Sequence, residues 1–173
     1  IGDNLARRAR GRKGGAHNAL YSRSAGRVEV RGAGHATSRE QVIGALQGKT
    51  AEASRVASAL QDNTIGLFVL EDSLFERSLR GLGDSPDDIA RTMGYSIENR
   101  MYVRASDADG VATALHEGVH ALDWLDGMDL TNRSRRFLES RAHVAEEEFF
   151  GAIGLRRKSN VEIQLDLDAL GYR

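Results

Sequence analysis

Apolar residues recur at helical spacing in two consecutive stretches of the second half of the chain. In the first stretch they recur every three or four residues before Gly127, a residue suited to ending a helix: Val111, Leu115, Val119, Leu122 and Leu125. In the second stretch Asn132 or Ser134 is a candidate N-cap, and the apolar positions continue to Phe149, Phe150 and Gly151. The pattern predicts two amphipathic helices joined by a loop.

The first half of the chain predicts further helices. Ser38 followed by Gln41 has the spacing of a capping box, and apolar residues then recur from 42 to 60, which fits one long helix or two short ones. Ser85 followed by Pro86 and two acidic residues predicts the start of a short helix.

Strand patterns lie between these helices. Residues 26–32 alternate apolar and polar side chains, and Ile65–Leu70 is a short apolar run of the kind found in a central strand. Residues 94–97 and 101–104 are two more runs, separated by the turn-like residues 98–100, and predict a hairpin. We therefore expect a mixed α and β fold with a small sheet.

Composition restricts the chemistry available to this fold. With 173 residues, 40% of them hydrophobic, the chain fits one globular domain. It contains no cysteine, which excludes disulfides, thiolate nucleophiles and cysteine-ligated metal sites, and leaves histidines, carboxylates and hydroxyls. No apolar run is long enough to span a membrane, and no secretory signal is present. Because the first residue is Ile1, we expect a piece of a larger protein.

The net charge of −1 conceals an uneven distribution of charge. Residues 1–66 carry 11 basic and 5 acidic side chains, whereas residues 67–173 carry 13 basic and 20 acidic ones. We interpret residues 1–35 as a basic, glycine-rich leader or linker and residues 36–173 as the folded domain. An arm that binds nucleic acid or a membrane surface is the alternative, but only Tyr21 could stack on a base, so we do not expect nucleic acid as a partner.

One motif in the first of the two helices points to specific chemistry. His116-Glu117-Gly118-Val119-His120 has the HExxH spacing, which places two imidazoles one helical turn apart on the same face. Two such imidazoles can bind one zinc ion, and Glu117 lies beside them as a candidate general base. The alternative interpretation is a pair of ordinary core or surface histidines.

A hydrolytic zinc site needs a third protein ligand, and the second helix offers one. Glu139, His143 and Glu146 share one face of that helix, and eighteen residues separate His120 from Glu139, enough for the chain to return alongside the first helix. We expect Glu139 to be the ligand, His143 to lie next to the site and Glu146 to extend the same network.

The stretch from Glu139 to Phe149 and the helix His116–Asp123 together resemble the gluzincin branch of zinc metallopeptidases, including the anthrax lethal factor group and metallopeptidase toxin domains. The resemblance covers about residues 90–151. It implies an α+β, zincin-like fold, in which a small mixed sheet packs on the HExxH helix and on a second ligand-bearing helix. It also implies Zn²⁺ on His116, His120 and Glu139, with Glu117 as general base.

Other ligand assignments remain open. The lethal factor group would favour Glu148, the metzincin spacing would favour Asp126, and His143 and the glutamates 146–148 are further candidates. Asp123 lies one turn after His120 and either contacts a ligand imidazole or faces solvent. His143 stands where many gluzincins have an acid that orients a ligand histidine.

The expected activity is zinc-dependent cleavage of a protein or peptide, with Glu117 moving the proton. His143, Tyr95, Tyr102 or Tyr172 would donate a hydrogen bond to the carbonyl oxygen under attack, and the strand Met101–Arg104 would pair with extended substrate.

The leader and the small cysteine-free domain also resemble the C-terminal toxin modules of polymorphic bacterial toxins, including those delivered by Rhs-repeat or type VI secretion proteins. That resemblance implies an effector that is secreted by a route other than the general secretory pathway and acts in the cytoplasm of a target cell, with an immunity protein as a candidate partner. We expect the protein to be a monomer. A cytoplasmic regulatory metallopeptidase and a nonenzymatic binding module with a basic arm are the alternatives.

Overall fold

The computed structural model describes residues 21–25, 29–128 and 134–172, which form a mixed α+β fold. The elements are β1 (Tyr21–Ala25), α2 (Arg39–Leu46), α3 (Ala51–Gln61), β2 (Gly66–Leu70), α4 (Asp72–Leu82), α5 (Pro86–Arg91), β3 (Thr92–Ile97), β4 (Arg100–Arg104), α6 (Gly110–Leu125), α7 (Arg135–Ala152) and α8 (Asn160–Ala169). The predicted α+β class with a small mixed sheet is confirmed. Within the described ranges, no helix is long and apolar enough to cross a membrane.

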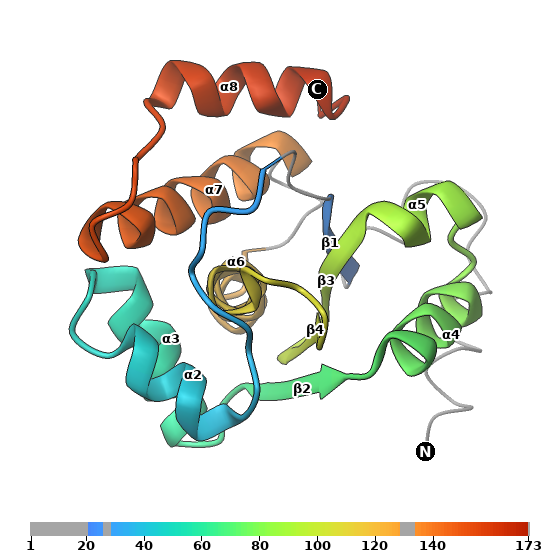
Figure 1. Ribbon diagram of the computed structural model, residues 1–173, viewed down its shortest axis with the longest axis horizontal. Coiled ribbons are helices and arrows are strands. Elements are labelled where there is room, and N and C mark those ends of the chain that lie inside the picture. The colour runs from blue at the N-terminus through green and yellow to red at the C-terminus, as the bar shows by residue number, and fades with distance from the viewer. Residues whose placement is uncertain (1–20, 26–28, 129–133, 173) are drawn as a thin grey trace.

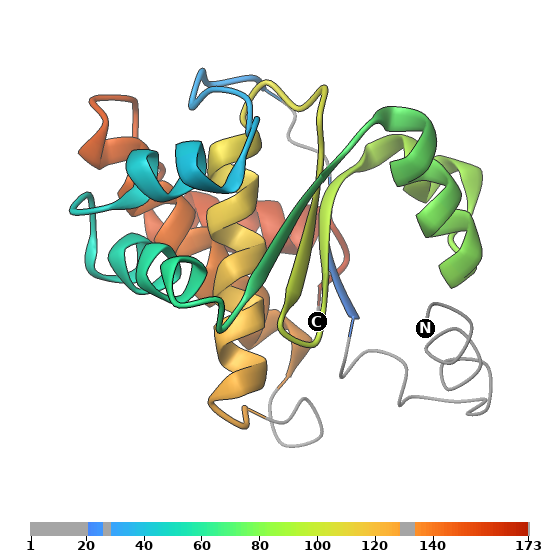
Figure 2. The same ribbon diagram turned by 90° about the horizontal axis from the view of Figure 1, so that it is seen from below.

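Helix α6 runs through the centre of the molecule. The sheet lies on one side of it, with α4 and α5 beyond the sheet, and α2, α3 and α7 lie around its other sides (Figures 1 and 2). Every residue from Gly110 to Asp123 is buried. The sequence predicted one apolar face, but the opposite face is also covered, so the polar side chains of Thr113, His116 and Glu117 lie in the interior. Buried polar groups require partners, and these partners define the candidate site.

The sheet has the order β1-β3-β4-β2. β3 and β4 form the predicted antiparallel hairpin, β2 runs parallel to β4, and β1 adds to the open edge of β3 in antiparallel orientation. Two strand predictions are therefore wrong. The run Ile65–Leu70 is not central, because β2 is an edge strand and Phe68 is 44% exposed. The strand Met101–Arg104 is not an edge open to substrate, because β4 is paired on both sides.

The helix starts follow the predicted capping chemistry. The hydroxyls of Ser38, Ser85 and Ser134 each accept a hydrogen bond from the backbone N–H three residues later. The apolar stretch from 42 to 60 forms two helices, because Gly48 adopts a left-handed conformation and Thr50 caps the second helix. Helices α4 and α8 were not predicted from the sequence.

The segment after β1 is attached to α6 and α7. The carboxylate of Asp109, at the start of α6, accepts hydrogen bonds of 2.7 Å from the backbone N–H groups of Arg31, Gly32 and Ala33. The Arg31 guanidinium pairs with Glu147 and lies 3.7 Å from the centre of the Phe150 ring. Of the strand predicted over 26–32, residues 29–32 are not in a strand and 26–28 lie outside the described residues. Residues 1–20 of the predicted leader also lie outside the described residues.

Gly118, inside the HExxH motif, allows α3 to approach α6 closely. A Cβ atom at this position would lie 2.5 Å from a methyl group of Val56. We expect Gly118→Ala to lower the free energy of unfolding by about 1–3 kcal/mol, as overpacking of a core does. Chemical denaturation measures this change. Gly81→Ala in α4, where nothing lies within 4 Å, is the control and should not destabilise the protein. A stable Gly118→Ala variant would contradict the packing argument.

Candidate metal centre

Helices α6 and α7 pack against each other and bring three predicted ligands together. The Nε2 atoms of His116 and His120 lie 3.3 Å apart. The Oε2 atom of Glu139 lies 3.4 Å from Nε2 of His116 and 3.7 Å from Nε2 of His120. The sequence predicted these residues from the HExxH motif and from the position of Glu139 on the following helix, and the structure places their ligand atoms as a compact triangle of one oxygen and two nitrogen atoms.

This triangle has the dimensions of a zinc site. Zinc binds histidine nitrogen and carboxylate oxygen at about 2.0–2.2 Å, and tetrahedral geometry then separates two ligand atoms by about 3.4 Å. The three observed separations of 3.3, 3.4 and 3.7 Å lie close to that value. His116 and Glu139 are at most 1% exposed, and His120 is 8% exposed. The buried His116, His120 and Glu139 could therefore hold a metal ion.

Glu146 contacts the opposite nitrogen of the first histidine. Its Oε2 atom lies 3.4 Å from Nδ1 of His116 and 3.4 Å from Nδ1 of His143. A carboxylate on Nδ1 fixes the orientation of an imidazole and leaves Nε2 for a metal ion, which is the usual arrangement around metal-bound histidine. Glu146 therefore lies in a position to orient His116, whereas many gluzincins have such an acid at the position of His143. His143, Glu146 and His116 also form a second group of potential ligand atoms.

Glu117 lies between α6 and strand β3. Its side chain is fully buried and makes a hydrogen bond with the side chain of Ser96. Burial raises the pKa of Glu117 and the nearby Glu139 carboxylate raises it further, while His116, His120 and the Ser96 hydrogen bond oppose the rise. A carboxyl group with a raised pKa beside two imidazoles is suited to accepting and returning a proton.

No protein-family model, curated protein or solved structure matches this chain. The candidate site is therefore supported by its geometry and its chemistry. The similarity to gluzincins stays a prediction from the two helices.

The two carboxylates that face His116 change the proton affinity of the cluster. Burial alone would lower the pKa of His116, but hydrogen bonds with Glu139 and Glu146 outweigh it and raise the pKa to about 10. Burial raises the pKa of Glu139, yet the imidazoles of His120 and His116 outweigh it and hold the pKa well below the usual value. Because a metal ion needs neutral imidazole, an ion that binds Nε2 of His116 must displace a proton.

The alternative ligands at the ends of the two helices are engaged elsewhere. Asp126, the residue that follows α6, is exposed and pairs with Arg55 at 3.0 Å. Glu148 pairs with Arg157 at 3.6 Å. Neither residue belongs to a group of potential ligand atoms within the described part of the chain.

Glu147 and Asp123 also have cationic partners. Glu147 pairs with Arg31, and Asp123 pairs with Arg141. The pKa of Asp123 is raised because burial outweighs the opposing effects of Arg141 and His120. Asp123 therefore connects α6 to α7 through Arg141.

Of the four candidate hydrogen-bond donors, only His143 lies beside the cluster. Its ring centre is 4.7 Å from that of His116, and its side chain is 23% exposed. The Tyr95 hydroxyl donates to Ser78, and Tyr95 and Tyr102 pack with the residues of α4, on the other face of β3 and β4 from α6. Tyr172 packs on α8. Successive side chains of a strand point to opposite faces, and Gly94 and Ser96 face α6. Tyr95 therefore faces away from α6 and from the candidate metal centre.

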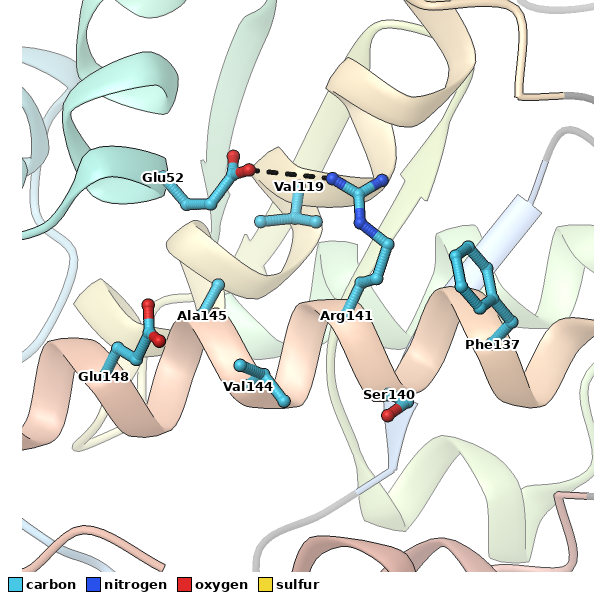
Figure 3. Close-up of a pocket in the computed structure, with 8 residues that line it drawn as sticks. All are labelled: Glu52, Val119, Phe137, Ser140, Arg141, Val144, Ala145 and Glu148. Atoms are coloured by element: carbon cyan, nitrogen blue, oxygen red, sulfur yellow. Dashed lines mark ion pairs between the residues drawn. The ribbon is translucent and has the colours of Figure 1, made fainter. Parts of the chain in front are cut away.

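A surface pocket lies on the opposite face of α7 from the ligands. Figure 3 shows its lining side chains, including Glu52 of α3 and Phe137, Arg141 and Glu148 of α7. The Arg141 guanidinium reaches across to Glu52 at 3.6 Å (Figure 3). At 100° per residue, Arg141 and Glu148 lie roughly 160–200° around the helix from Glu139, so this pocket is separate from the metal cluster.

Replacing the orienting carboxylate tests its role. We expect Glu146→Gln to weaken zinc binding by about 10–100-fold, the usual effect of losing a carboxylate that orients a ligand histidine. Competition with a fluorescent zinc chelator measures this. Glu148→Gln, two residues further along α7 and on the other face, is the matched control and should bind zinc like the wild type. Equal affinities for both variants would exclude an orienting role for Glu146.

Proposed function

We propose that this protein is a zinc-dependent endopeptidase. The observation that carries the proposal is the triangle of His116, His120 and Glu139, whose atom separations match a tetrahedral zinc site, next to the buried Glu117. Three protein ligands leave a fourth position, as in hydrolytic rather than structural zinc sites. The zincin-like fold and the kinship with gluzincins belong to this proposal.

The chain's own residues divide the work of peptide hydrolysis. Zinc, when bound, polarises the scissile carbonyl and makes a water molecule more acidic. Glu117 accepts a proton from the attacking water and delivers it to the amide nitrogen as the C–N bond breaks. His143 contacts Glu146 through Nδ1, and in its imidazolium form it also donates a hydrogen bond from Nε2 to the carbonyl oxygen.

Release into a target cell as a toxin or effector domain, with an immunity protein as its inhibitor, remains our proposal for the biological role. It rests on the basic leader of residues 1–35 and on the resemblance to polymorphic toxin modules. A regulatory metallopeptidase would share the same centre. Loss of toxicity together with loss of hydrolysis in one variant would favour the effector role.

Metal removal tests the activity. We expect about one zinc ion per chain by elemental analysis, and hydrolysis of unfolded casein that disappears on treatment with 1,10-phenanthroline and returns when zinc is added back. The chelator is added without diluting the protein, and zinc is then restored to the same sample. Recovery of hydrolysis shows that the chelator did not damage the protein irreversibly. A chain that binds no zinc, or that cleaves casein equally well without metal, would exclude the proposal.

A further inference from the structure

Strand β1 lies beside the part of β3 that contacts the candidate general base. Ser22 and Ser24 are paired with Ser96 and Gly94 of β3. Ser96 makes the hydrogen bond with Glu117, and a Cβ atom on Gly94 would lie only 3.1 Å from Cγ of Glu117. β1 also lies against α6. The backbone of Ser22–Ser24 therefore runs alongside the metal centre, one strand spacing from β3.

Without β1, strand β3 would be the open edge of the sheet. Its other side is paired with β4, so removal of β1 would expose the N–H and C=O groups of β3 that now face β1. Such an edge binds an extended peptide through main-chain hydrogen bonds, largely independently of the peptide's sequence. The edge of β3 is thus the surface next to Glu117 on which an extended chain can be held.

The candidate centre is buried in the structure with β1 in place. His116, Glu117 and Glu139 are each at most 1% exposed. A hydrolytic centre must admit a peptide bond to its open coordination position. A substrate therefore has to displace part of the structure, and β1 is the element that already has the conformation and the pairing of an extended peptide.

We propose that β1 occupies the binding position of the substrate strand, so that the chain inhibits itself and cleaves extended, unfolded segments once β1 is displaced. This inference rests on the proposed peptidase function. The substrate strand would run antiparallel to β3, as β1 does.

The attachment of the following residues makes β1 a strong competitor. Five residues separate Ala25 from Arg31, and residues 31–33 are held by Asp109 while Arg31 pairs with Glu147. A short tether of this kind gives an effective concentration on the order of millimolar. A substrate of similar affinity at micromolar concentration displaces β1 from only a small fraction of the molecules, so removal of β1 from the edge should raise kcat/KM at least about tenfold.

Two double variants of the full chain separate inhibition from other effects. Successive residues of a strand direct their N–H groups to opposite sides, so Ser22 and Ser24 donate to one side and Tyr21 and Arg23 to the other. The two double variants are Ser22→Pro/Ser24→Pro and Tyr21→Pro/Arg23→Pro. Proline has no N–H group, so one of these variants loses the N–H groups of β1 that face β3, and the other loses those that face away from β3. Amide hydrogen exchange of residues 93–97 identifies the pair that breaks the ladder.

We expect the ladder-breaking pair to hydrolyse casein at least about tenfold faster than the wild type with equal zinc content, and the other pair to stay within about twofold. Equal rates for all three chains would overturn the inference while leaving the peptidase function intact. A ladder-breaking variant that is slower than the wild type despite full zinc content would also overturn it.

If none of the three chains hydrolyses casein, the proposed function is excluded. A binding measurement then still tests whether β1 occupies a position that an extended peptide can take. A fluorescent peptide with the sequence of residues 19–27 is titrated into the Glu117→Gln form of each chain. Binding to the ladder-breaking form at micromolar peptide, with none to the other two, would support an edge of β3 that accepts an extended strand. Absence of binding to the ladder-breaking form would overturn the inference.

Discussion

Glu117→Gln should give a folded, zinc-loaded protein whose hydrolysis of unfolded casein is about 10²–10⁴-fold slower, the usual contribution of a general acid–base group. Glutamine has nearly the shape of glutamate, so the fully buried position is filled and the contact with Ser96 can be kept. The amide cannot accept the proton of water at neutral pH, and therefore the variant lacks the proton transfer to the leaving nitrogen. Initial rates normalised to bound zinc measure the loss.

Asp126→Asn is the matched control for this variant. Asp126 is an exposed carboxylate just beyond the same helix and pairs with Arg55. Its replacement should leave both zinc content and hydrolysis within about twofold of the wild type, because exposed ion pairs contribute little. Undiminished hydrolysis by the Glu117→Gln protein would remove Glu117 from the proposed mechanism. A large loss of zinc or of hydrolysis in Asp126→Asn would instead favour Asp126 as the zinc ligand, as in the metzincin spacing.

Glu139→Gln should reduce zinc affinity by more than about 100-fold, beyond the range expected for an orienting group. A neutral amide is a poor zinc ligand compared with a carboxylate, and only His116 and His120 would remain in the triangle. Zinc that binds only the folded state raises stability by about 4 kcal/mol at a free concentration about 1,000 times Kd. The variant should therefore lose the zinc-dependent rise in melting temperature, measured by differential scanning fluorimetry.

The comparison of Glu139→Gln with Glu146→Gln decides between the two groups of ligand atoms. Both groups share His116, but Glu139 faces its Nε2 atom and Glu146 faces its Nδ1 atom. A larger loss of affinity in Glu139→Gln assigns the ion to the triangle with His120. The reverse ranking would assign it to the group with His143.

The three residues of the candidate metal centre could be predicted because their placement depends largely on local geometry. HExxH and the Glu139, His143 and Glu146 pattern each follow from 3.6 residues per turn, and α6 and α7 supply that regularity. The contact between Nδ1 of His116 and Glu146 depends on how the two helices dock. The way two helices dock depends on how their side chains pack against each other. The spacing of residues within either helix does not determine this packing.

The sheet could not be ordered from sequence for the same reason. Ile65–Leu70 is as apolar as a central strand, yet β4 lies between β2 and β3. Local composition predicts that a run is a strand, whereas its neighbours are chosen by contacts between distant residues. Ser96 was missed because a serine in a strand gives no signal until the helix that faces it is known. The capping box of Ser159 and Glu162 was a readable signal for α8.

The dependence of the centre on α7 sets an order of events during synthesis. His116 and His120 precede Glu139 along the chain, and Arg31 finds its partner Glu147 only 116 residues later. A chain that grows from its N-terminus can form neither contact until residues 139–147 have left the ribosome. Under the proposed function, a nascent chain that has not yet released residues 139–147 has no complete metal centre and therefore no peptidase activity.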